Sequence, residues 1–244
     1  MNLILMLCIV FLAAFVQGVV GFGFGMICMA SLYSLISAEK LVPLISILSI
    51  ILSSGLLYRL RSHFQPGYLL PLLAGGVTGV PIGVLFLRTA PSHYFTLALG
   101  IVIIFWVLST ALKAHQSGSE NPRLPAVFAG FASGILGGAF NTGGPPVLFY
   151  ISRRPWEPND TKATLQAFFL GTSSVQLLLL SHYRFFTEEI INLDMVLAPF
   201  VLLGLWVGSS VSRSINRTLF RLFVLIGLAM MGIFYLARGL MSIF

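Results

Sequence analysis

Charge is scarce in this chain of 244 residues. Asp, Glu, Lys and Arg together make up 9% of the sequence, whereas 57% of the residues are apolar. A soluble domain carries roughly 25% charged residues. A soluble protein of this size could neither hide so much apolar surface nor present so few charges to water. The composition therefore excludes a soluble enzyme, a nucleic-acid-binding module, a disordered chain and a coiled coil, and it predicts an integral membrane protein.

Side chains that commonly carry chemistry are also few. Cys8 and Cys28 lie inside apolar stretches and are interpreted as small buried hydrophobes, without the neighbouring His or Cys that a metal site needs. No Walker motif and no Ser/His/Asp arrangement is present, so we expect no cofactor and no enzymatic activity. No charged residue lies in the middle of an expected crossing, so proton transfer through a buried carboxylate has no candidate. The excess of 14 Lys and Arg over 7 Asp and Glu is interpreted mainly as loop charge that sets the topology.

Long apolar segments dominate what the sequence does contain. Six of them have the length of one helical crossing, roughly 20 residues; they are 41–58, 67–87, 93–112, 162–183, 190–212 and 218–240. Two others, 2–36 and 124–151, are too long for one helix and carry glycine-rich interruptions. Because glycine and proline weaken or end a helix, each overlong stretch is predicted to form two short helices that meet at a break. The second helices should begin near Gly25 and near Pro145.

The basic residues indicate that both broken stretches fold back as hairpins. A hairpin topology places ten of the Lys and Arg residues on one side of the membrane and four on the other, whereas single crossings would give eight and six. The positive-inside rule favours the more unequal division. The richer side is therefore predicted to be cytoplasmic, and both termini are predicted to be extracytoplasmic.

Each half of the chain then holds one broken-helix hairpin and three transmembrane helices. Because that number of crossings is odd, two similar halves must be inverted relative to each other. A shift of 116 positions places Gly18 and Gly21 on Gly134 and Gly137. We therefore predict an all-α membrane protein with two inverted repeats, residues 1–116 and 117–244, which is the architecture of secondary transporters.

The breaks are the predicted substrate site. Unwound backbone survives in a membrane only where protein or a water-filled cavity covers it, so the two breaks should meet around a cavity. The short helices that begin there would direct amide N–H groups and a partial positive charge towards an anion. Alternatively, the glycines serve only close helix packing, although this does not account for two adjacent prolines. The candidate substrate-binding residues are Gln17, Gly21, Phe22, Gly23, Gly25, Asn141, Thr142, Gly143, Gly144 and Pro145.

Two further polar residues, Gln166 and Ser173, share a helical face and are secondary candidates for lining the path. Intrahelical hydrogen bonding is the alternative explanation for Ser and Thr in this segment.

The sequences Gln17-Gly18, Gly21-Phe22-Gly23 and Gly137 to Pro146 resemble the paired motifs of the TauE/SafE sulfite exporter family. The resemblance covers essentially the whole chain. It implies a bacterial cytoplasmic-membrane transporter with two inverted repeats, which moves sulfur-containing anions such as sulfite, sulfoacetate and other sulfonates, or some organic acids. It also implies that the motif residues surround the substrate. Relatives often carry glycine where Asn141 stands.

The leading hypothesis is therefore a secondary transporter of small sulfur-containing anions that works by alternating access. The alternatives are a passive anion channel with the same pocket and a transporter of short carboxylates; a membrane-embedded enzyme or scaffold is disfavoured. The expected partners are a small anionic substrate and the lipid bilayer, with no nucleic acid, and the sequence leaves the oligomeric state open.

Overall fold

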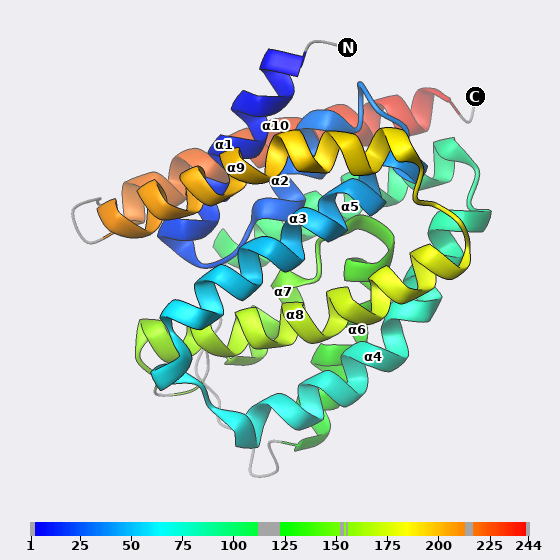
Figure 1. Cartoon of the computed structure of the whole chain (residues 1–244). Helices are drawn as coiled ribbons and strands as arrows, with labels where there is room; N and C mark the ends of the chain where they lie inside the picture. The colour runs from blue at the N-terminus through cyan, green and yellow to red at the C-terminus, as the bar shows by residue number, and fades with distance from the viewer. Residues whose placement is uncertain (1–2, 112–122, 152–153, 155, 213–216, 243–244) are drawn as a thin grey trace.

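The computed structural model of the chain describes residues 3–111, 123–151, 154, 156–212 and 217–242, and this part of the protein contains helices and no strand (Figure 1). The helices are α1 (Leu3–Val20), α2 (Phe24–Leu32), α3 (Ala38–Arg59), the short 3-10 helix η1 (Arg61–His63), α4 (Pro66–Thr89), α5 (Ser92–Ala111), α6 (Arg123–Phe140), α7 (Gly144–Ile151), α8 (Pro158–His182), α9 (Glu188–Val211) and α10 (Arg217–Met241).

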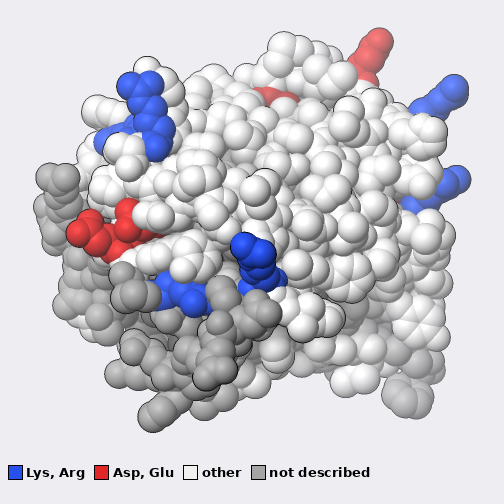
Figure 2. All heavy atoms as spheres, turned by 90° about the horizontal axis from the view of Figure 1, so that it is seen from below, with Lys and Arg blue, Asp and Glu red and all other residues white. Residues whose placement is uncertain are grey.

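The prediction of an all-helical membrane protein is confirmed. Within the part of the chain that the structure describes, seven helices are long and apolar enough to cross a membrane: α1, α3, α4, α6, α8, α9 and the Leu222–Met241 part of α10. Each of the six predicted crossings forms a single helix, α5 being the one with a shorter apolar stretch, Ser92–Leu108. Large apolar side chains such as Phe105, Trp206 and Phe223 point outwards, and most of the face in Figure 2 carries no charge. A surface of this kind suits contact with lipid.

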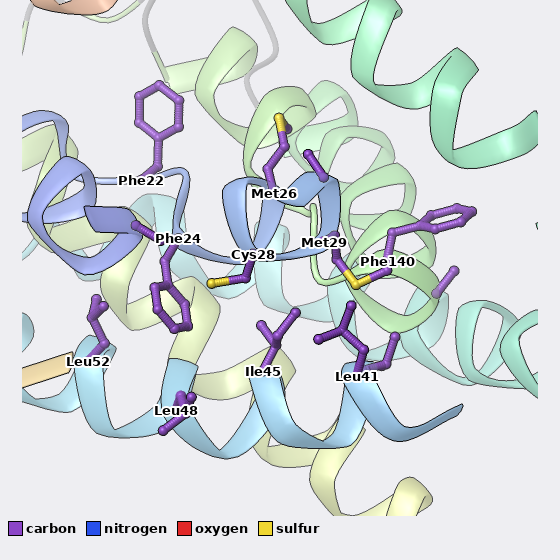
Figure 3. Packing of buried hydrophobic residues seen from close by; sticks show 14 of the residues in the cluster. Phe22, Phe24, Met26, Cys28, Met29, Leu41, Ile45, Leu48, Leu52 and Phe140 are labelled. Atoms are coloured by element: carbon purple, nitrogen blue, oxygen red, sulfur yellow. The ribbon is translucent and has the colours of Figure 1, made fainter. Parts of the chain in front are cut away.

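The first overlong stretch is interrupted at Gly21–Gly23. Both glycines have positive φ, 98° and 110° respectively, a conformation that glycine adopts without steric cost. The second helix of this stretch, α2, begins at Phe24, one residue before the expected position. It packs against α3 in the opposite direction, with Phe24 near Leu52 and Met29 near Leu41 (Figure 3). The first arm, α1, has 18 residues and is longer than the short helix that we expected.

The second overlong stretch is interrupted between Phe140 and Gly144, and α7 starts one residue before the predicted Pro145. Asn141 has a φ of 53° in this break. The hydroxyl of Ser133, on α6, donates to the Gly143 carbonyl and accepts the Val147 N–H at 3.3 Å. These bonds turn α7 back along α6. As in the first stretch, the arm before the break, α6, is a long helix of 18 residues.

Each hairpin packs against a helix from the other half of the chain. The first arm, α1, lies along α9, and α6 lies along α4. Glycines make both contacts close: a Cβ at Gly208 would overlap the carbonyl oxygen of Phe15, and one at Gly79 would overlap that of Phe131. Small residues allow such backbone contact between membrane helices. Part of the glycine content therefore does serve packing, while the division into two inverted repeats stays a prediction.

Basic residues group at the two ends of the helix bundle. One set, Arg59, Arg61, Arg154 and Lys162, is here called the basic end, where His63 Nδ1 lies 3.1 Å from Asp160. At the opposite end Lys40 pairs with Glu189 at 2.6 Å, and Arg88 lies over the Tyr183 ring. Lys113, Arg153 and Arg213, which also entered the topology prediction, lie outside the described residues. The cytoplasmic location of the basic end stays a prediction.

The expectation that no buried carboxylate is available for proton transfer is wrong. Asp194 lies within α9 and is only 4% exposed, and its carboxylate makes no hydrogen bond to another described residue. The physical reason is the rotation of α9, whose inward face carries Asp194 together with Ile190, Leu197 and Val201. A buried carboxylate is therefore present inside the bundle. The two cysteines also differ, because Cys28 is buried but Cys8 is exposed.

Candidate functional site

The two breaks enclose a cavity of about 50 Å³, here called the chamber. Space of this size holds a few water-sized groups. Its walls come from α1, α2, α3, α4, α6, α7 and α8 and from the two breaks. The predicted residues that line it are Gln17, Phe22, Gly23, Gly25, Asn141, Thr142, Gly143, Gly144, Pro145 and Ser173. Gly21 and Gln166 do not line it. No charged side chain lines the chamber among the residues that the structure describes.

The two breaks touch each other at Gly25. A Cβ at this position would overlap the carbonyl oxygen of Asn141, so only glycine allows the backbones to come this close. This contact brings the first turn of α2 directly against the second break. Because the breaks lie far apart in the sequence, the contact also fixes how the two hairpins meet.

Gln17 and Gln166 organise the first break. The Gln17 side-chain amide donates to Gln166 Oε1 at 3.2 Å, and its own oxygen accepts the Phe24 N–H at 2.9 Å. Gln166 in turn donates to the Gly21 carbonyl at 2.7 Å. Gln17 therefore caps α2, while Gln166, which is fully buried behind it, holds the unwound backbone in place. Such bonds satisfy polar groups that have no water partner within a membrane.

Polar side chains at the second break also bind backbone groups. Asn141 turns towards α3, where its amide donates to the Val42 carbonyl at 2.9 Å and its oxygen accepts from Ser46 at 3.2 Å. The Gln176 amide donates to the Gly137 carbonyl at 3.0 Å, and the Thr142 hydroxyl donates to Leu136 at 3.4 Å. The Gln176 and Thr142 bonds add side-chain donors to carbonyls at the end of α6, which also accept the backbone N–H groups of Asn141 and Thr142. Asn141 and Thr142, expected as substrate donors, are thus already engaged within the protein.

Three serine hydroxyls face the chamber without such partners. Ser49 and Ser53 on α3 and Ser173 on α8 line it and make no hydrogen bond to another described residue. Sequence reasoning named Ser173 but missed the two serines on α3. The signal was present, since Ser46, Ser49 and Ser53 are spaced three and four residues apart and so lie on one helical face. Thr172, by contrast, bonds back to the Phe168 carbonyl of its own helix at 2.9 Å.

Two helix N-termini open onto the chamber, at Gly25 on α2 and at Gly144 on α7. The start of a helix carries roughly half a positive charge and N–H groups that lack helical acceptors. Pro145 and Pro146 have no N–H to offer, and the Val147 N–H already donates to Ser133. The start of α2 therefore offers more backbone N–H groups to a ligand, whereas α7 contributes chiefly its dipole.

These features define a class: a multi-pass helical membrane protein whose two interrupted hairpins meet around an uncharged polar chamber. The comparison with known families agrees with this class. The model of the sulfite exporter TauE/SafE family matches residues 6–235, so the chain belongs to this family, which comprises transporters rather than enzymes.

One similar curated protein is the "Probable sulfite/organosulfonate exporter TauE" of Cupriavidus necator. It is 31% identical over 171 residues, which cover 66% of this chain and 65% of the relative. No solved structure gives a significant match.

Proposed function

We propose that the protein is a secondary transporter that exports small sulfur-containing anions, such as sulfite and organosulfonates, through the chamber. The observation that carries the proposal is an uncharged polar chamber at which two helix N-termini meet. Helix dipoles and hydroxyl donors compensate an anion without a fixed cation. An anion held in this way is bound specifically and is still released readily, as transport requires. The name of the similar Cupriavidus protein supports the substrate class.

The donors available to the anion come from different parts of the chain. Ser49 and Ser53 approach from α3 and Ser173 from α8, while Gly25 marks the positive end of α2. An oxyanion with three oxygens fits such a divided set of donors. The glycines of the breaks let its oxygens come close to the backbone.

The way that the hairpins pack supports alternating access. Each hairpin contacts a helix of the opposite half, α1 with α9 and α6 with α4. If the halves are inverted repeats, each half can adopt the conformation that the other half now has. This exchange opens the chamber first to one side of the membrane and then to the other. The buried hydrogen bond between Gln17 and Gln166 supports a barrier on one side of the chamber rather than a continuous pore.

The test is uptake of labelled sulfite by proteoliposomes that contain the purified protein, with a Gly144→Leu variant. A Cβ at Gly144 would meet Phe169 and Phe22 at 3.6 and 3.8 Å, which is ordinary contact, so the larger side chain should fill the chamber without breaking the fold. We expect sulfite flux to fall at least tenfold. Gly67→Leu is the matched control, because nothing lies within 4 Å of a Cβ there.

Normal flux in Gly144→Leu would contradict the site. Non-saturating flux with a measurable single-channel current would indicate the passive channel instead. Stronger competition by short carboxylates than by sulfonates would assign the chamber to carboxylates.

A further inference from the structure

A second polar pocket lies at the basic end, where α1, α3 and α9 finish and α8 begins. Its volume is about 260 Å³, several times that of the chamber, and we call it the basic pocket. Two cationic side chains, Arg59 and Lys162, line it together with Asn159, Ser209 and Ser212. No acidic residue contributes to its wall among the residues that the structure describes. A hollow lined by one sign of charge concentrates oppositely charged ions.

Lys162 is held firmly in the wall of this pocket. Its side chain is only 9% exposed, and its ammonium group donates to the Val19 carbonyl at 2.7 Å and to Gly18 at 3.5 Å. These carbonyls form the last turn of α1, where the helix dipole favours a cation. The aliphatic part of Lys162 rests against Gly21, where a Cβ would come within 2.6 Å of Cγ. The cation is thus fixed next to the first break.

Arg59 provides the second charge from the end of α3. One of its guanidinium nitrogens donates to the Ser209 hydroxyl, which ties the side chain to α9. A guanidinium carries five N–H donors in a planar fork, so several remain for another acceptor. The fork matches two oxygens of an oxyanion, and the pairing is stronger than that of a neutral donor.

The basic pocket and the chamber are neighbours along the same helices. On α1 the chamber is lined by Gln17 and the pocket by the next residue, Gly18; on α3 the corresponding pair is Ser53 and Leu56. On α8, Lys162 lines the pocket, and Gln166 one turn later bonds to Gln17. The hydrogen bond between the two glutamines therefore lies at the boundary between the two spaces.

We propose that the basic pocket is a second anion site, a vestibule that binds the transported oxyanion between Arg59 and Lys162 on its way to or from the chamber. This proposal rests on the proposed function. The ligand is a free sulfite or sulfonate, whose oxygens accept from the guanidinium fork and the Asn159 amide. Its negative charge balances two cations that the chamber itself does not offer. The same chemistry would also fit the phosphate of an anionic lipid, so the test separates these two sources.

The test compares Arg59→Gln with Arg61→Gln. Arg61 belongs to the same basic end but lies over the Tyr58 ring, 4.9 Å from its centroid, and does not line the pocket. In proteoliposomes of zwitterionic lipid, Arg59→Gln should raise the sulfite concentration for half-maximal transport at least fivefold and leave the maximal rate within twofold. Arg61→Gln should change neither value. Arg59→Lys, which keeps the charge, should recover at least half of the loss.

Equal effects of Arg59→Gln and Arg61→Gln would overturn the vestibule and indicate general surface charge. An effect of Arg59→Gln that appears only when anionic lipid is added would also overturn it and assign the pocket to a lipid headgroup.

A binding measurement separates this proposal from the proposed function. In the chamber-blocked Gly144→Leu protein, sulfite should still raise the melting temperature in detergent, because a ligand that binds the folded state stabilises it. The shift should disappear in the Gly144→Leu/Arg59→Gln double variant. If wild type moves no sulfite but this pattern holds, the transport function fails and the anion site stands. If sulfite raises the melting temperatures of the Gly144→Leu protein and the double variant equally, the vestibule proposal is wrong, whatever the wild type transports.

Discussion

At the scale of single residues, the site is built from amide side chains that replace missing helical bonds. The Gln17 side chain accepts from the Phe24 N–H and donates to Gln166, and Gln166 donates to the Gly21 carbonyl. Each bond satisfies a polar group that would be costly to bury alone. The hydroxyls of Ser49, Ser53 and Ser173 are left for a ligand. One group of side chains thus holds the breaks in place, and a different group offers the chamber hydroxyls that are unpaired within the described part of the chain.

Replacing Gln17 by leucine tests this division of roles. The change leaves the Phe24 N–H and the Gln166 oxygen without their present partners, so we expect a loss of about 1–3 kcal/mol of stability. The measurement is thermal unfolding of the detergent-purified protein. Gln65→Leu is the control, because Gln65 precedes α4 and its side chain caps no helix. Equal melting temperatures for the two variants would show that the Gln17 bonds are not needed to hold the break.

At the scale of helices, glycine determines which pairs come into contact. Gly75 on α4 faces Val127 on α6, and Gly83 faces Ile135. Because the residue numbers rise in the same direction along both helices, α4 and α6 run parallel. The contact between α1 and α9 has the same form. Without a hydrophobic force between helices in lipid, close van der Waals packing of this kind becomes the main source of association.

Gly79→Val should disrupt the α4–α6 pair. The added side chain overlaps the carbonyl of Phe131, and overpacking of a rigid contact typically costs about 1–3 kcal/mol or more. We expect a lower yield of monodisperse protein in size-exclusion chromatography. Gly227→Val on α10 is the matched control, since no atom lies within 4 Å of a Cβ there. A monodisperse Gly79→Val protein with the wild-type yield would show that the helices can move apart without loss.

At the scale of the whole molecule, the hairpins decide the orientation of the chain. The first hairpin returns before α3, so the amino terminus and Ser37 should lie on the same side of the membrane, opposite Gln65. The excess of basic residues at the other end predicts that Gln65 is cytoplasmic.

Single cysteines at Ser37 and Gln65, in a protein lacking Cys8 and Cys28, test this orientation. A membrane-impermeant thiol reagent added to intact cells should label Ser37→Cys and leave Gln65→Cys unlabelled until the membrane is opened. An epitope tag at the amino terminus should be accessible together with Ser37. Labelling of the tag and Ser37→Cys from opposite sides of the membrane would contradict the hairpin, and with it the predicted inversion of the two halves.

Composition and local residue patterns were sufficient to predict the class of the protein, the six single helices and the positions of both breaks. Hydropathy and helix interruption depend on residues that are neighbours in the sequence. The starts of α2 at Phe24 and of α7 at Gly144 could therefore be predicted to within one residue. The environment of individual polar groups could be read only from the folded chain, in which Asn141 turns towards α3, Gln166 lies behind Gln17 and Asp194 is buried. Those outcomes depend on the rotation of each helix about its axis, which is set by packing between segments far apart in the chain.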